Sequence, residues 1–251
     1  MFPVKDENPQ INVPYVTYGL IALNVLVWVF VQGLGSEEAL MSSICDFGIM
    51  PGNITGAEGV VGDPTMCPLK QQADWFTFLS SMFMHGGWMH IIGNMWFLWI
   101  FGDNVEDSMG PGRYLVFYVL SGIAAAAAQV FMDVGSFIPM VGASGAIGGV
   151  MGAYIVLYPR VHVHLFIIIF FRSIAVPAIL MLGYWVLMQF WGVYSSMGDA
   201  GGGTAFWAHI GGFVAGAALV LVFKNEKLLA DHPYRGWNQK DHKGSVWKRA
   251  V

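Results

Sequence analysis

Six long runs of this sequence contain no Asp, Glu, Lys or Arg, and they constrain the fold more than any other feature. A helix that crosses a bilayer needs about 20 mostly apolar residues, and each run supplies that length or nearly so. The chain is 56% hydrophobic and 11% charged, whereas soluble domains are about 25% charged. We therefore expect an all-α polytopic membrane protein with six transmembrane helices. The runs are Asn8–Ser36, Trp75–Gly102, Tyr114–Met132, Val134–Pro159, Ser173–Gly198 and Ala200–Phe223.

The runs also predict the organisation of the chain. The first run starts too late and is too long for a cleaved signal peptide, so we interpret it as a retained helix. One domain, 14–224, holds all six helices and a long outer loop, 35–86, between a short N-terminus, 1–13, and a basic tail, 225–251. The expected helices are 14–34, 87–104, 113–132, 143–158, 172–193 and 205–224.

The distribution of lysine and arginine predicts the orientation of the chain across the membrane, because cytoplasmic loops are enriched in these residues. With both termini in the cytoplasm, only Lys70 of the 12 Lys and Arg residues lies outside. We therefore expect cytoplasmic termini, and the compact six-helix form fits a bacterial inner (plasma) membrane. The basic tail is interpreted as a topology anchor at the lipid headgroups. No basic patch is interleaved with aromatic residues, so no nucleic-acid partner is expected.

Cys45 and Cys67 are the only cysteines, and both fall in the predicted outer loop. A disulfide is stable outside the cytoplasm, and it would close a loop rich in Gly and Pro. Two free thiols are the alternative that the sequence leaves open.

The fourth apolar run should form an unusually short helix. Gly135, Pro139 and Gly142 interrupt its first part, so regular helix is expected from Ala143 to Tyr158. These 16 residues span about 24 Å at 1.5 Å per residue, less than the ~30 Å hydrocarbon core. The start of this helix, with Ser144, should therefore be partly submerged below the outer surface. Irregular backbone at that depth implies a watery cavity.

Four polar residues within the expected helices stand at positions of interest: His90, Asn94, Ser144 and His209. Polar groups inside a membrane are costly and tend to face the bundle interior or water. Glycines spaced four apart on the fourth and sixth helices allow close packing, which would bring His209 near Ser144. A serine becomes a nucleophile when a base such as histidine accepts its proton. His90, Asn94 and the Ser144 N–H are candidate donors to an oxyanion. The alternative for each residue is helix packing or an interhelical hydrogen bond.

Other chemistries receive less support from the sequence. No H-E-x-x-H motif is present, which argues against a zinc protease. No intramembrane carboxylate pair is available for an aspartyl mechanism, and His162 and His164 form only a weak metal-binding pattern. We therefore expect no metal and no cofactor.

Three motifs together give the sequence a family resemblance. They are "HGGWMHIIGN" at 85–94, "GASG" at 142–145 and "AHIGGFVAG" at 208–216, in this order on the second, fourth and sixth helices. The chain resembles the rhomboid intramembrane serine proteases from about Tyr15 to Phe223. The segment after the second helix is also similar, and the resemblance implies a structural role for Glu106 there.

The resemblance implies a Ser144–His209 catalytic dyad that acts through an acyl-enzyme intermediate, with His90 and Asn94 assisting the oxyanion. It also implies substrates that are membrane-anchored proteins, cleaved in or near a transmembrane segment within the lipid bilayer. One position departs from the pattern. Many relatives carry an aromatic ring four residues after the serine, stacked on the catalytic histidine, whereas this chain has Gly148. The orientation of His209 would then depend on another ring.

Two other classes of function were weighed against this one. A catalytically weak or inactive rhomboid-like protein that binds membrane clients is the main alternative, favoured by Gly148 and opposed by the presence of both Ser144 and His209. A small transporter or channel should show inverted repeats or charged residues near the midplane, and the sequence has neither.

Overall fold

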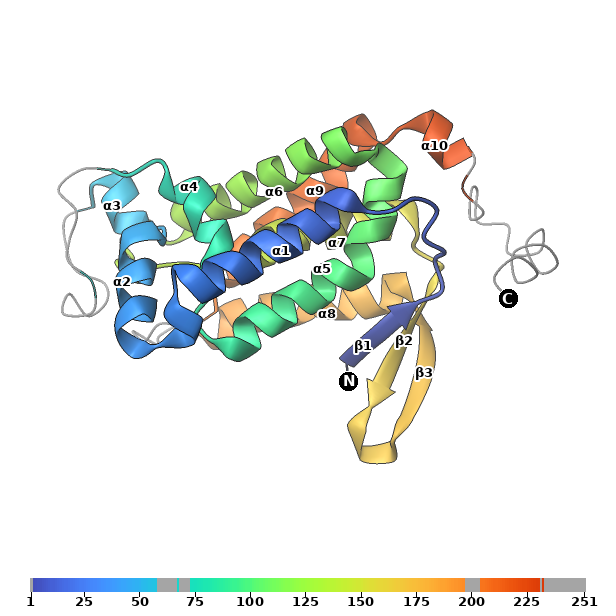
Figure 1. The fold of residues 1–251 in the computed structure, drawn as a ribbon, viewed down its shortest axis with the longest axis horizontal. Helices are drawn as coiled ribbons and strands as arrows, with labels where there is room; N and C mark the ends of the chain where they lie inside the picture. The colour runs from blue at the N-terminus through green and yellow to red at the C-terminus, as the bar shows by residue number, and fades with distance from the viewer. Residues whose placement is uncertain (1, 58–66, 68–72, 197–203, 231, 233–251) are drawn as a thin grey trace.

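The structure, a computed structural model, describes residues 2–57, 67, 73–196, 204–230 and 232 of the 251-residue chain. In this part of the chain, all six expected helices are present and pack against one another as a bundle (Figure 1). Their bounds match the expected ones within a few residues, except at the start of the fifth. They are α1 (Tyr15–Phe30), α5 (Trp88–Met109), α6 (Pro111–Met132), α7 (Ser144–Leu157), α8 (Ala178–Ser195) and α9 (Phe206–Phe223).

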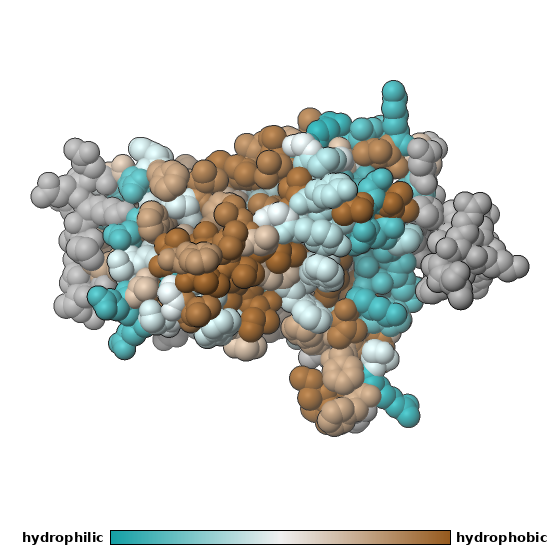
Figure 2. Space-filling view, viewed as in Figure 1, coloured by the Kyte–Doolittle hydropathy of each residue, from teal (hydrophilic) through white to brown (hydrophobic). Residues whose placement is uncertain are grey.

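The helices present an apolar surface that suits lipid. Helices α6, α8 and α9 are long and apolar enough to cross a membrane, with mean hydropathies of 2.0, 1.3 and 1.9, and α1 and α7 are shorter apolar helices. A hydrophobic zone crosses the middle of the face seen in Figure 2, with hydrophilic residues toward both ends. The number of six membrane spans and the depth of α7 stay predictions. The shortness of α7 is confirmed, since regular helix covers 14 residues from Ser144.

The expectation of an all-α fold missed a small antiparallel sheet with the strand order β1-β2-β3. Its strands are β1 (Phe2–Asp6), β2 (His162–Ile167) and β3 (Arg172–Pro177). The prediction that the fifth helix begins at 172 is therefore wrong, because residues 172–177 pair with β2. Ile174 and Val176 are β-branched and favour a strand, and Pro177 biases the residue before it toward extended backbone.

The predicted outer loop 35–86 has structure of its own in the part that is described. It contains the end of η1 (Gly33–Gly35), then α2 (Glu37–Phe47), α3 (Pro51–Thr55), α4 (Thr77–Ser80) and η2 (Ser81–Phe83). Cys45 of α2 lies at disulfide distance from Cys67, with 5.3 Å between their Cα atoms, which favours the disulfide over two free thiols. Lys70 lies outside the described residues. Helices α2, α3 and α4 gather at one end of the bundle, and β1, β2 and α10 (Glu226–Ala230) lie toward the other (Figure 1).

Two buried carboxylates attach the N-terminal segment to α5. Glu106 accepts hydrogen bonds from the backbone N–H groups of Val16 and Thr17 at 3.0 and 2.8 Å, and from the Thr17 hydroxyl at 2.8 Å. Asp107 accepts from the backbone N–H groups of Ile11 and Asn12 at 2.7 and 2.9 Å. The first N–H groups of a helix lack intrahelical partners, and negative charge is favourable there. Glu106 therefore caps α1, which is the structural role that the resemblance implied.

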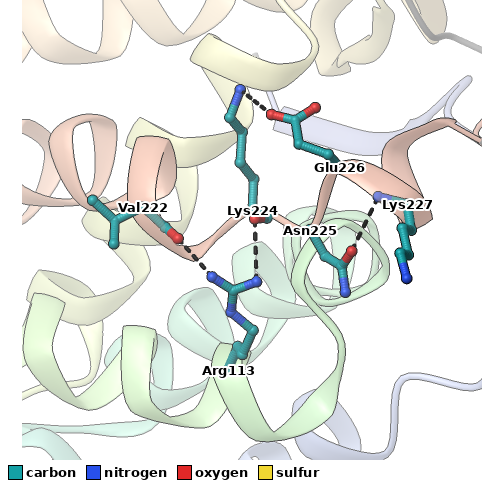
Figure 3. Close-up of polar contacts among 6 residues, drawn as sticks. All are labelled: Arg113, Val222, Lys224, Asn225, Glu226 and Lys227. Atoms are coloured by element: carbon teal, nitrogen blue, oxygen red, sulfur yellow. Dashed lines mark hydrogen bonds and ion pairs between the residues drawn. The ribbon is translucent and has the colours of Figure 1, made fainter.

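An arginine caps the C-terminal end of α9 (Figure 3). Arg113 of α6 donates to the carbonyl oxygens of Val222 at 2.6 Å and Lys224 at 3.3 Å. A cation is favourable at the C-terminus of a helix, where carbonyls lack intrahelical donors. Beyond it, Lys224 forms an ion pair with Glu226 at 2.8 Å. Most of the predicted basic tail, 231 and 233–251, lies outside the described residues.

Replacing Glu106 with alanine should destabilise the fold substantially. The change leaves the Val16 and Thr17 donors without their charged acceptor in a buried site, at a cost of about 2 kcal/mol or more. Thermal unfolding of the detergent-solubilised protein measures the effect. Glu38→Ala, at an exposed glutamate in the first turn of α2, is the matched control and should leave the midpoint nearly unchanged. Equal midpoints for both variants would contradict the capping role of Glu106.

Candidate active site

The site begins with a glycine-mediated contact between α7 and α9. A Cβ atom on Gly212 would overlap the carbonyl group of Gly145, and one on Gly216 would overlap the backbone of Gly149. The two backbones therefore approach more closely than any side chain would permit, as small residues allow in membrane helices. The predicted packing of these two helices is confirmed.

This contact brings together two residues that are far apart in the sequence. Ser144 is the first residue of α7, and His209 lies in the first turn of α9. The Nε2 atom of His209 is 2.8 Å from the Oγ atom of Ser144. Both side chains line a cavity of about 810 Å³. The expected proximity and the expected cavity are therefore both present.

His90 and Asn94, one helical turn apart on α5, line the same cavity. The backbone N–H of Gly86 donates to Nδ1 of His90 at 3.1 Å. The side chain of Asn94 is only 7% exposed, and within the described part of the chain its Nδ2 atom has no hydrogen-bond partner. A buried amide N–H₂ group without an acceptor is costly, so it is available to a group that enters the cavity.

The α7–α9 interface explains why position 148 carries a glycine. A Cβ atom there would lie 3.0 Å from the carbonyl oxygen of His209 and 3.5 Å from the nitrogen of Phe213. A Cβ at this position would therefore be tight against α9, and any larger side chain would require α9 to give way. The ring beside His209 comes instead from α8, where the Trp185 ring lies with its centroid 5.7 Å from that of His209.

A second contact from α8 was not predicted from the sequence. The Oε1 atom of Gln189 is 2.8 Å from Nδ1 of His209. Trp185 and Gln189 are four residues apart, so both project from one face of α8 toward the histidine. One signal was present in the sequence: Gln189 is the only amide in an otherwise apolar helix, and such residues mark functional interiors of membrane bundles.

Known proteins similar in sequence to this chain are rhomboid proteins. The family model described as "Rhomboid domain" matches residues 72–226, more than half of the chain. The chain is 30% identical to Rhomboid protease GluP of Bacillus subtilis over 83% of its own length and 35% of GluP. It is 32% identical to RHOMBOID-like protein 5 of Arabidopsis thaliana over 34% of its length and 28% of that protein. It is 27% identical to Rhomboid protease AarA of Providencia stuartii over 58% of its length and 51% of AarA.

These matches define the class of protein to which the structure belongs. The apolar helices and the rhomboid domain make it an integral membrane protein. The chain belongs to the rhomboid family. It spans about a third of the length of the first two of these relatives and about half of the third.

The glycine contact can be tested by adding a single methyl group. Gly216→Ala should lower stability by about 1–3 kcal/mol, the usual cost of forcing extra atoms into a packed interface, because the new Cβ overlaps the backbone of Gly149. Gly183→Ala in α8 is the control, since nothing lies within 4 Å of its added Cβ. Alanine there should be neutral or stabilising. Thermal unfolding in detergent measures both, and equal midpoints would rule out the proposed close contact.

Proposed function

We propose that this protein is an intramembrane serine endopeptidase that cleaves membrane-anchored proteins in or near a transmembrane segment. The proposal rests above all on the 2.8 Å contact between Ser144 Oγ and His209 Nε2 inside a cavity. A serine hydroxyl hydrogen-bonded to an imidazole is the arrangement from which acyl transfer starts. Membership in the rhomboid family supports the same reaction.

In this mechanism Ser144 is the nucleophile and His209 is the general base. Ser144 Oγ attacks the carbonyl carbon of the scissile peptide while His209 Nε2 accepts its proton. The imidazolium then gives that proton to the leaving amine, the C–N bond breaks, and the new N-terminus departs. A water molecule attacks the acyl ester that remains. His209 accepts a proton from that water, the ester C–O bond breaks, the Ser144 oxygen recovers the proton, and the new C-terminal carboxylic acid departs.

His90 is suited to donate a hydrogen bond to the developing oxyanion. Because Gly86 N–H donates to Nδ1, that nitrogen carries the lone pair and the proton of the neutral ring is on Nε2. A Cβ built on Gly142 would lie 2.7 Å from His90 Nε2 and 3.4 Å from Ser144 Oγ. The absent methyl group therefore leaves a position for an oxygen atom between the donor and the nucleophile. Asn94 Nδ2 and the backbone N–H of Ser144, at a helix start, are further donors.

We also propose the domain arrangement and orientation that the sequence predicts. Residues 14–224 form the six-span protease domain, with 1–13 and 225–251 in the cytoplasm of a bacterial cell and α7 partly submerged. The separation of α2, α3 and α4 from β1, β2 and α10 along the bundle supports termini on one side (Figure 1). Substrate would enter laterally beside α8, which borders the cavity through Trp185.

Labelling by a fluorophosphonate probe tests the nucleophile directly. The wild-type protein in detergent or proteoliposomes should be labelled, and Ser144→Ala should lose both labelling and cleavage of a single-span reporter substrate while keeping its unfolding midpoint. Ser121→Ala, at another buried helix serine, is the control and should retain both. Cleavage that persists in Ser144→Ala would refute the assignment. An unlabelled wild type that still retains membrane proteins would favour the inactive client-binding alternative.

A further inference from the structure

The amide of Gln189 contacts His209 on the side of the ring that faces away from Ser144. Its Oε1 atom is 2.8 Å from Nδ1, whereas Nε2, the other ring nitrogen, faces the serine hydroxyl at 2.8 Å. The Gln189 side chain is buried, with 8% of the residue exposed. The three groups therefore form a continuous chain of hydrogen bonds that runs from α8 through α9 to the start of α7.

The orientation of this amide is fixed by a neighbour on its own helix. Gln189 Nε2 donates to the carbonyl oxygen of Trp185 at 3.0 Å, one turn earlier in α8. A carbonyl oxygen can only accept, so the NH₂ end of the amide must face Trp185. With the amide reversed, two oxygens would face each other in a buried site. Oε1 is therefore the end presented to His209.

The amide in turn determines which ring nitrogen of His209 carries the proton. Oε1 is an acceptor, so Nδ1 must be the donor in this contact. In the neutral ring, Nε2 then carries the lone pair, directed at the Ser144 hydroxyl. The opposite tautomer would leave Nδ1 and Oε1 as two acceptors in contact. It would also place the ring proton on Nε2, and a protonated Nε2 cannot accept the proton of the Ser144 hydroxyl.

We infer that Gln189 is a positioning residue that holds His209 in the Nδ1–H tautomer, so that Nε2 is ready to accept the proton of Ser144. This inference rests on the proposed function. It extends the dyad to three hydrogen-bonded residues, in which a neutral amide orients the base. Gln189 does not touch the substrate or exchange protons. It acts only through the imidazole.

An amide suits this place better than a carboxylate does in a membrane. A buried carboxylate loses several kcal/mol of hydration unless it is well paired, whereas the amide supplies the same acceptor without a charge. The contact also survives the reaction, because Nδ1–H stays a donor when Nε2 takes up the serine proton. An acceptor at this position then stabilises the positive ring. Trp185 contributes twice, with its ring beside His209 and its carbonyl group as the anchor of Gln189.

Two substitutions at 189 separate the acceptor from the bulk of the side chain. Gln189→Met keeps a similar length and volume but removes the acceptor, whereas Gln189→Glu keeps an oxygen facing Nδ1. We expect a roughly tenfold fall in kcat for Gln189→Met, the size of one buried hydrogen bond, with KM unchanged and Gln189→Glu closer to wild type. Met188→Leu, at a neighbouring exposed position of α8, should match wild type. Wild-type kcat in Gln189→Met, or a loss in KM alone, would overturn the inference.

The tautomer itself can be read independently of activity. The protein with ¹⁵N-labelled histidine in nanodiscs is studied by ¹H–¹⁵N NMR at mildly alkaline pH, and the His209 signals are assigned by their loss in His209→Gln. Wild type should show the proton on Nδ1 of His209, and Gln189→Met should show a mixture of both tautomers. A wild-type ring with its proton on Nε2, or an unchanged tautomer in Gln189→Met, would refute the inference. Failure of the proposed function would instead appear as an unlabelled Ser144 while the tautomer is as expected.

Discussion

The close approach of α7 and α9 is the contact on which the rest of the site depends. Side chains normally hold helix axes about 8–10 Å apart, whereas α7 and α9 meet backbone to backbone beside Ser144 and His209. Gly145, Gly149, Gly212 and Gly216 remove those side chains where the two backbones meet. The same approach disfavours a ring at position 148, since a Cβ there would lie 3.0 Å from the carbonyl oxygen of His209. The ring beside the histidine comes from a third helix, α8.

The helix ends around that contact are also fixed by side chains. Polar groups at these ends are satisfied by side chains from neighbouring helices, which are buried for Glu106 and Asp107 and exposed for Arg113. Glu106 and Asp107 of α5 bind the N–H groups that precede and begin α1, and Arg113 of α6 binds the carbonyls that end α9 (Figure 3). In low-dielectric surroundings each unsatisfied group would cost several kcal/mol, so these caps join helices as well as terminate them. The cap on α9 lies at the end of the helix opposite to His209.

The sequence predicted the six helices and the meeting of Ser144 with His209 because those features depend on strong local signals. Charge-free runs reveal helices in lipid, and glycine spacing reveals close packing. The sheet escaped prediction because β2 and β3 are short, apolar strands beside longer helices, and β1 pairs with β2 across more than 150 residues. Gln189 escaped because its partner lies on another helix, and no local pattern states which face of α8 turns toward His209. A lone amide in an apolar helix indicates a polar contact but does not identify the partner residue.

In the proposed mechanism the two histidines of the cavity take different roles, and the reason lies in their neighbours. His90 receives a backbone N–H at Nδ1, so its free nitrogen is a donor, and His209 faces an amide oxygen at Nδ1, so its free nitrogen is an acceptor. Identical side chains are thereby suited to the two proposed roles, oxyanion donor and base, because one has a donor behind it and the other an acceptor. Neither assignment needs a charged residue in the cavity, which matters in a membrane because a buried charge is expensive. A neutral dyad with neutral orienting groups is thus an arrangement that lipid surroundings favour. Gln189 and Gly86 are the residues that set it.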